Sequence, residues 1–170
     1  FIEGVKNRNL TAVMVFVDFC KAFDSINHNT MFKILQAYGI PPQIVEAIRL
    51  SYSNLKAKIR SPDGETDYFK IYAGVMQGDT LAPYLFVIVL DYAMRNAING
   101  REVELGFTIQ PRRSSRYPAV AISDMDFADD IVLISNEIEQ ARKLILRVQS
   151  ECRKVGLELN VKKTKAMFYN

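Results

Sequence analysis

The sequence Phe127-Ala128-Asp129-Asp130 lies between two short apolar runs, Val120–Ile122 and residues 131–135. Runs of this length and composition predict β-strands, and the polar segment between them predicts the turn of a hairpin. Adjacent carboxylates about 4 Å apart repel each other by about 4 kcal/mol at an effective dielectric of about 20. A divalent cation offsets that repulsion, and so does exposure to water. A turn lets both side chains face one site, whereas a regular strand sends neighbours to opposite faces.

A second strand ends at another carboxylate. Ala12–Val17 is a continuous, valine-rich apolar run, typical of a strand buried on both faces, and Asp18 follows it. If the two strands are neighbours, Asp18 and Asp129 meet at one edge of the sheet, where oxygen ligands suit Mg²⁺. Paired ions about 3.5–4 Å apart would hold the attacking and leaving oxygens of a phosphoryl transfer. A lone Asp-Asp pair is more often a solvated turn, and a lone Asp after a strand is mostly structural. Their joint placement weakens these interpretations without removing them, so both they and the metal hypothesis stay open at this point.

The rest of the chain alternates between helical and extended patterns. Helical spacing of apolar residues predicts one helix over residues 31–38, capped by Asn29 or Thr30 and ended by Gly39, and a second opened by Pro41-Pro42. It also predicts buried and amphipathic helices over residues 81–98 and 138–155. Residues 56–72 predict a β-hairpin turning at 62–65, residues 101–118 a surface loop or loose hairpin, and residues 157–159 with 166–169 a final strand pair. These hairpins favour an α+β fold, an antiparallel sheet with helices on one face, over a doubly wound parallel sheet.

Length and composition are those of one globular domain. The chain has 170 residues, of which 49% are hydrophobic and 24% charged, and a net charge of +3 that is compatible with a polyanionic partner without proving one. Cys20 and Cys152 are far apart in sequence, which argues against a disulfide framework or a cysteine zinc site and fits a reducing, intracellular compartment. The uncharged run over residues 80–90 is too short for a membrane span, and no signal peptide is visible, so we expect no membrane partner. Because the sequence opens with Phe1, we expect a segment of a longer polypeptide.

Four segments in chain order resemble the catalytic motifs of a reverse transcriptase palm, most closely that of non-LTR (LINE-type) retrotransposons. They are residues 15–24 (Val-Phe-Val-Asp-Phe-Cys-Lys-Ala-Phe-Asp), 74–86 (Gly-Val-Met-Gln-Gly-Asp-Thr-Leu-Ala-Pro-Tyr-Leu-Phe), 127–130 and 156–165 (Gly-Leu-Glu-Leu-Asn-Val-Lys-Lys-Thr-Lys). The resemblance covers nearly the whole chain. It implies a polymerase palm with partial fingers elements, and it implies that residues 1–170 are a palm fragment without the upstream fingers and downstream thumb of the parent polypeptide.

The resemblance also implies roles for individual residues. Asp18, Asp129 and Asp130 would be the catalytic carboxylates, and with the backbone carbonyl of Phe19 they would bind two Mg²⁺ ions, for which Mn²⁺ is a possible substitute. Phe23 stands at the steric-gate position, where a bulky ring excludes the 2′-hydroxyl of a ribonucleotide. On sequence alone Phe23 would be interpreted as a core aromatic, and the motif reverses that interpretation.

Further residues are assigned to the nucleotide and to nucleic acid. Gln77 and Gly78 would contact the incoming nucleotide and the template base, with glycine allowing close backbone approach. Lys163 or Lys165 would protonate the leaving pyrophosphate or bind phosphate, although a lysine-rich turn is usually just solvated. His28 is predicted to be structural. Asp79 departs from the family pattern, because many relatives have a small or neutral residue at this position. Arg112, Arg113 and Arg116 could contact the nucleic-acid backbone, but a plain surface loop is at least as good an interpretation.

The predicted function is that of an RNA-directed DNA polymerase palm. Its partners would be an RNA template, a DNA primer and a dNTP, and by resemblance it would act in the nucleus. The isolated segment is expected to be poorly active without fingers and thumb. A non-catalytic palm kept as a nucleic-acid-binding or scaffold module is the main alternative, which the retained carboxylates disfavour. A nucleotide cyclase is disfavoured by the Gln77-Gly78 pair and Phe23, since a cyclase needs neither a template contact nor a deoxyribose gate.

Overall fold

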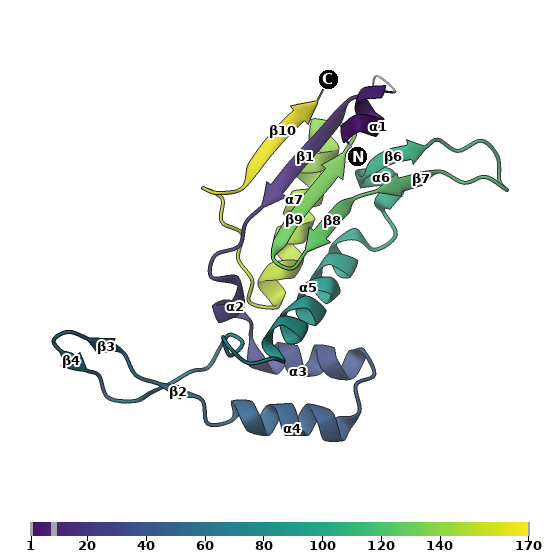
Figure 1. The fold of residues 1–170 in the computed structure, drawn as a ribbon. Helices are drawn as coiled ribbons and strands as arrows, with labels where there is room; N and C mark the ends of the chain where they lie inside the picture. The colour runs from purple at the N-terminus through teal and green to yellow at the C-terminus, as the bar shows by residue number, and fades with distance from the viewer. Residues whose placement is uncertain (1, 8–9, 170) are drawn as a thin grey trace.

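A four-stranded antiparallel sheet forms the centre of the computed structural model, which describes residues 2–7 and 10–169. The strand order is β10 (Lys165–Tyr169), β1 (Ala12–Val17), β9 (Asp130–Ser135) and β8 (Asp124–Phe127). Helices α5 (Ala82–Ile98) and α7 (Ile138–Lys154) pack against each other on one side of the sheet, and α3 (His28–Ala37) and α4 (Pro42–Tyr52) lie beyond α5 (Figure 1). The predicted α+β class with an antiparallel sheet and helices on one face is therefore confirmed.

The smaller elements connect these layers. They are α1 (Ile2–Asn7), α2 (Ala22–Ser25), β2 (Lys56–Ala57), β3 (Arg60–Ser61), β4 (Gly64–Glu65), β5 (Phe69–Lys70), α6 (Glu102–Leu105), β6 (Phe107–Gln110) and β7 (Val120–Ile122). The predicted hairpin over residues 56–72 is present as the pairs β2–β5 and β3–β4. It projects away from the body of the molecule (Figure 1).

Alternation along β1 divides the sheet into two faces. Val13, Val15 and Val17 are buried and stand opposite residues 135, 133 and 131 of β9, on the side that the helices cover. The intervening residues of β1 face the other way. Met14 on that outer face packs with Phe107 in a second, smaller cluster beneath β6 and α1, whereas Phe16 is 42% exposed. The outer face is thus covered at the start of β1 and open at its end, where Asp18 follows.

Helix ends follow the local sequence signals with one correction. The Asn27 side chain, not Asn29 or Thr30, caps α3, because its Oδ1 accepts the backbone N–H of Thr30 at 3.0 Å. Proline opens α4 as predicted. Glu137 and Gln140 form a reciprocal capping box at the start of α7.

Two strand predictions are wrong. Residues 157–159 do not pair with 166–169: β10 pairs with β1 in the register Phe168↔Val13 and Ala166↔Val15, which brings its apolar side chains to the helix side. The strand paired with β9 is β8 rather than Val120–Ile122, which instead pairs with β6. The sequence Asp124-Met125-Asp126-Phe127 is typical of a polar loop, yet it forms an edge strand in which every second residue is acidic.

The region predicted as a surface loop or loose hairpin, residues 101–118, contains α6 and β6, and the latter pairs with β7. Among the helices of residues 2–7 and 10–169, none has the length and apolarity needed to cross a bilayer.

Candidate active site

The sheet register brings the predicted catalytic carboxylates to one end of the sheet. Val17, the last residue of β1, stands opposite Ile131, the second residue of β9. Asp18 therefore leaves β1 beside the point where Asp130 enters β9, and Asp129 precedes it in the turn from β8. Asp18 continues the outer-face alternation of β1, and the pair Phe127↔Asp130 shares that face.

The turn that carries Asp129 is tight and strained. Phe127 pairs with Asp130, so the connection between β8 and β9 has two central residues, Ala128 and Asp129. Ala128 has a φ of +56°. A positive φ at the first central position alone is the pattern of a type II′ turn, in which glycine is the usual residue. Strain kept at a non-glycine residue is typical of functional sites, and here it fixes an exposed carboxylate at the tip of the hairpin.

Backbone hydrogen bonds hold the segment after β1 against the start of the 156–165 motif. The backbone N–H of Asn160 donates to the carbonyl of Asp18 at 2.7 Å, and that of Cys20 donates to the carbonyl of Glu158 at 2.8 Å. Phe19 and Leu159 form the antiparallel bridge between them. Because successive carbonyls of an extended chain point to opposite sides, the Phe19 carbonyl faces away from residue 159.

The Asp18 carboxylate has unused acceptor capacity. Its Oδ2 atom is buried and has no hydrogen-bond partner among the described residues, although the side chain as a whole is 40% exposed. The Lys163 ammonium is 4.0 Å from Oδ2, too far for a hydrogen bond. A buried carboxylate oxygen that accepts no hydrogen bond is costly; the distant Lys163 ammonium offsets part of that cost, and a bound cation would offset more.

The donor set fits a hard divalent ion that keeps several ligands from solvent and substrate. Within the described ranges, no three His, Cys, Asp or Glu side chains are grouped to hold a metal by themselves. Mg²⁺ is commonly held by one or two carboxylates together with water and substrate phosphates, so a site with Asp18, Asp129 and the Phe19 carbonyl does not need a closed protein cage.

The Phe23 ring is held rigidly next to this end of the sheet. It stacks on Phe86 of α5 with ring centroids 4.4 Å apart and an interplanar angle of 19°, and it is partly buried against the main core. The backbone N–H of Val75 donates to the Phe23 carbonyl at 2.7 Å. A ring held in this way can exclude a substituent by shape, because moving it would break its packing on Phe86.

Two glycines from different motifs pack on the segment that follows Phe23. A Cβ at Gly74 would lie 2.7 Å from Cα of Asp24, and a Cβ at Gly156 would lie 2.4 Å from the carbonyl oxygen of Ser25. The backbone N–H of Asn27 donates to the Val155 carbonyl at 3.0 Å. Residues 24–27 therefore lie in contact with both the 74–86 and the 156–165 segments, and we call residues 24–27 the central turn.

These sequence and structural features agree with comparisons to known proteins. Residues 2–169 match the family model described as reverse transcriptase (RNA-dependent DNA polymerase). The chain belongs to the reverse transcriptase family. Among curated relatives, it is 30% identical over 165 residues to a Pol polyprotein of the R2 retrotransposable element of Popillia japonica, covering 96% of this chain and 22% of the relative. It is 29% identical over 147 residues to the R2DM Pol polyprotein of Drosophila melanogaster, covering 86% of this chain and 13% of the relative.

Solved structures with the same fold include the telomerase of Candida tropicalis. Its apo form has a TM-score of 0.70 at 15% identity, covering 98% of this chain and 30% of that one. The same telomerase in complex with a fragment of telomeric RNA has a TM-score of 0.67 at 14% identity, covering 98% and 28%. The palm-like fold and the reverse transcriptase domain of a non-LTR retrotransposon are thus shown, and the chain spans about a fifth or less of these R2 polyproteins.

In this reverse transcriptase domain, the predicted nucleotide-binding residues lie in different surroundings. The Gln77 side-chain amide donates to Asp24 Oδ1 at 3.0 Å, which fixes its orientation. Gly78 has a φ of +89° and open space around its Cα. Lys163 lies near Asp18, whereas Lys165 is in β10 opposite Phe16. Their roles toward the nucleotide stay predictions.

The remaining candidates also receive positions. His28 Nε2 is 2.7 Å from the Gly74 carbonyl, so the ring braces the start of the 74–86 motif, in agreement with the predicted structural role. Asp79 Oδ1 accepts the backbone N–H of Leu81 at 3.1 Å, so this departure from the family pattern forms an Asx turn just before α5. The three loop arginines are exposed between β6 and β7.

Sequence reasoning missed two residues that position the reverse transcriptase site. Thr164 Oγ1 accepts the backbone N–H of Asp18 at 3.3 Å, and the Tyr52 hydroxyl oxygen accepts the backbone N–H of Met76 at 3.4 Å. Burial raises the pKa of Tyr52 above its usual value. Thr164 lies in a quoted motif and could have been singled out, but only the tertiary structure brings Tyr52 of α4 to the 74–86 segment.

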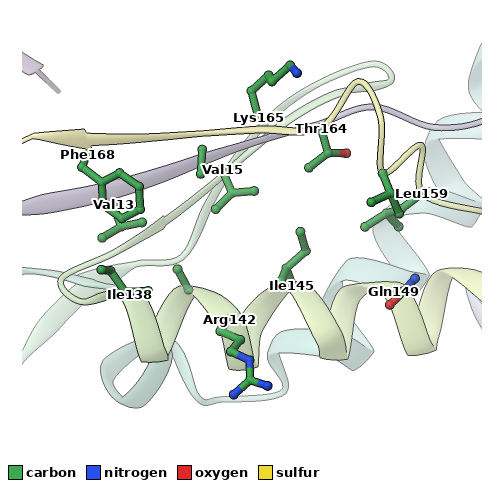
Figure 2. A pocket seen from close by; sticks show the side chains of 13 residues that line it. Val13, Val15, Ile138, Arg142, Ile145, Gln149, Leu159, Thr164, Lys165 and Phe168 are labelled. Carbon is green, nitrogen blue, oxygen red and sulfur yellow. The ribbon is translucent and has the colours of Figure 1, made fainter.

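Two cavities have linings that do not include Asp18, Asp129 or Asp130. An apolar groove of about 430 Å³ lies between α7 and the β1–β10 edge, with Val13, Ile145 and Phe168 among its lining side chains (Figure 2). A second cavity of about 350 Å³ is lined by acidic residues, including Asp91, Asp124 and Asp126. Burial, and then the charge of Asp124, raises the pKa of Asp126 to about 7. The residue is also solvent-exposed, so screening reduces the effect of this shift on stability.

Proposed function

We propose that residues 1–170 form the catalytic palm of an RNA-directed DNA polymerase and work within a longer polypeptide that supplies fingers and thumb. In the proposed reaction, the 3′-hydroxyl oxygen of a DNA primer attacks the α-phosphate of a dNTP on an RNA template. The new P–O bond forms as the bond to the β-phosphate oxygen breaks, and pyrophosphate leaves. The observation that carries this proposal is the register that places Asp18 beside the strained turn with Asp129 and Asp130.

Asp18, Asp129 and the Phe19 carbonyl would hold two Mg²⁺ ions, with Asp130 beside them. When bound, such ions neutralise charge on the phosphates and lower the pKa of the attacking hydroxyl. Support comes from the buried Oδ2 of Asp18, which accepts no hydrogen bond, and from the bridge that leaves the Phe19 carbonyl facing away from residue 159. Mn²⁺ would occupy the same oxygen sites, since both ions prefer oxygen ligands in octahedral geometry.

Two other side chains act on the substrate in this proposal. The Phe23 ring, stacked on Phe86, would lie against the sugar and exclude a 2′-hydroxyl. The Lys163 ammonium would bind the departing phosphates or give them a proton, because it is the lysine of the 156–165 motif that lies near Asp18. Acting on chromosomal targets, such a polymerase would work in the nucleus.

The test is Asp129→Asn, which keeps size but removes a metal-binding charge. In primer extension by the longer polypeptide, we expect extension to be lost while RNA binding is kept. In the 170-residue chain itself, Mn²⁺ should broaden the amide NMR signals of residues 17–20 and 127–131. In Asp129→Asn, about tenfold more Mn²⁺ should be needed for the same broadening.

Asp63→Asn, at the exposed tip of the 56–72 hairpin, is the matched control and should change neither result. Undiminished extension by the Asp129→Asn protein would remove the metal role. Broadening elsewhere in the chain would remove the proposed site. If the unaltered longer polypeptide binds RNA but extends no primer, the non-catalytic palm becomes the better interpretation of the sequence.

A further inference from the structure

The hairpin of residues 56–72 has an unequal distribution of charge along its length. Along the sequence, its basic residues lie before the turn and at position 70, and its acidic residues lie at the turn and just after it. The basic set is Lys56, Lys58, Arg60 and Lys70, and the acidic set is Asp63, Glu65 and Asp67. We call residues 56–60 and 68–72 the hairpin stem. Lys58 and Arg60 both form ion pairs with Glu65. An anionic partner would therefore be attracted to Lys56 and Lys70, the other two basic residues of the stem.

Two lysines of the stem are placed directly against each other. Lys56 of β2 and Lys70 of β5 are partners in the antiparallel register, so their side chains leave the same face of the ribbon. Like charges in directly opposed positions destabilise a β-ladder. Neither ammonium has a carboxylate within 4.0 Å in the part of the chain that the structure describes. The pair is a structural cost that an anion between the two lysines would remove.

Exposed aromatic rings accompany the basic side chains. Tyr68 is 66% exposed and Tyr72 is 77% exposed, both on the arm that carries Lys70 and at even spacing from it. The Lys58 ammonium lies 5.5 Å from the centre of the Tyr68 ring. Exposed rings next to lysines offer a stacking surface for bases beside binding positions for phosphates.

The stem leads directly into the candidate active site. The backbone N–H of Ile71 donates to the carbonyl of Leu55 at 3.0 Å, which closes the base of the hairpin. Ala73 then bridges to Asn27 of the central turn, one residue before the 74–86 motif. A cavity of about 470 Å³ at this junction is lined by side chains of both regions, including Leu55, Ile71 and Gln77. A chain lying along the stem would thus reach the residue predicted to contact the template base.

We propose that the hairpin stem binds single-stranded RNA, with phosphates between Lys56 and Lys70 and bases stacked on Tyr68 and Tyr72. Single strands are favoured over duplexes because only unpaired bases expose faces to a protein ring. Identification of this RNA as the incoming template rests on the proposed function. The binding itself does not depend on catalysis.

The experiment compares Lys56→Gln/Lys70→Gln with the unaltered 170-residue chain in binding a fluorescein-labelled, unstructured RNA of about 20 nucleotides. Each phosphate contact to a single strand contributes about 0.7 to the slope of log affinity against log salt, so two contacts contribute about 1.4. We expect the slope to become shallower by that amount and the affinity at about 0.1 M salt to fall by about 25-fold. Tyr68→Ala/Tyr72→Ala removes two stacking rings and should weaken binding by about 30-fold or more with the salt slope unchanged.

The matched control is Lys6→Gln/Lys143→Gln, which removes the same charge from exposed positions on α1 and α7. It should lose much less affinity than the stem variant. Melting of the stem variant should stay equal to or slightly above that of the unaltered chain, because a like-charge pair has been removed, so weaker binding cannot be attributed to unfolding.

Equal losses of RNA affinity in the stem and control variants would overturn the proposal. It would also be overturned if the chain bound duplex RNA or an acidic peptide more tightly than the single strand. Loss of extension in Asp129→Asn without loss of RNA binding would leave both proposals standing. If the stem variant loses more RNA affinity than the control variant, and Asp129→Asn still extends primers normally, only the proposed function is refuted.

Discussion

Gly156→Ala probes the packing of the 156–165 segment on the central turn. A Cβ at this position would lie 2.4 Å from the carbonyl oxygen of Ser25 and 2.9 Å from the amide nitrogen of Asn27. Both are backbone atoms, so no side-chain rotation can relieve the contact. Overpacking of this kind costs about 1–3 kcal/mol. The φ of +95° at Gly156 adds about 1–2 kcal/mol for a residue with a Cβ, and the stiffer unfolded chain returns about 0.4–1 kcal/mol.

The expected loss is therefore about 2–4 kcal/mol in the free energy of unfolding. For a chain of this size that lowers the melting temperature by about 5–15 °C, measured by circular dichroism. Gly39→Ala is the control, because Gly39 has a φ of +76° but nothing within 4 Å of the added Cβ. It carries the backbone cost alone, so its melting temperature should fall by about 3 °C. If the two variants melt within about 2 °C of each other, the close approach to the central turn is not present in solution.

The other predictions concern the sugar, a proton and the metal. In primer extension by the longer polypeptide, Phe23→Val should raise ribonucleotide incorporation by about tenfold. Phe23→Tyr keeps the ring and should keep the selectivity for deoxyribonucleotides. Equal sugar selectivity in the unaltered protein and both variants would exclude the gate. The folded-state pKa of Asp126, about 7, is above the ordinary value of 3.8, so the folded chain binds more protons between these limits and stability declines as pH rises from about 4 to 7. Asp126→Asn should abolish that decline and give the more stable protein at pH 8 in urea unfolding, by less than about 1 kcal/mol because the residue is exposed; parallel pH profiles would contradict this. Lys163→Gln should raise the Mn²⁺ affinity measured by EPR about two- to fivefold, because the ammonium near Asp18 no longer competes, and an unchanged affinity would place the ion elsewhere.

The sequence specified the elements better than their pairing. Helices α5 and α7 and strand β1 were predictable because their apolar periodicity coincides with one buried face over many residues. The partner of β10 was not, because Ala166 and Phe168 suit any strand with an apolar face, and the register with Val15 and Val13 is set by long-range packing. Strand β8 was missed because Asp124 and Asp126 are depleted in strands generally, and only its edge position tolerates them.

Motif order identified the candidate site, but not what holds it in place. The positions of Asp18 and Asp129 follow from one strand pairing, which the chain pattern suggested. The supporting contacts from Thr164 and Tyr52 join residues more than twenty positions apart, and no local pattern encodes them. Metal binding and the roles of the lysines toward the nucleotide stay predictions.

The groove beside β10 has a practical consequence for the isolated chain. Among the described strands, β10 is an edge of the sheet, and its Phe168 is 58% exposed next to the apolar lining of Figure 2. An open edge with exposed apolar side chains is a template for pairing with another copy, which leads to aggregation. Solutions of the chain should therefore become turbid with rising protein concentration, and charged substitutions along β10 should extend the usable range.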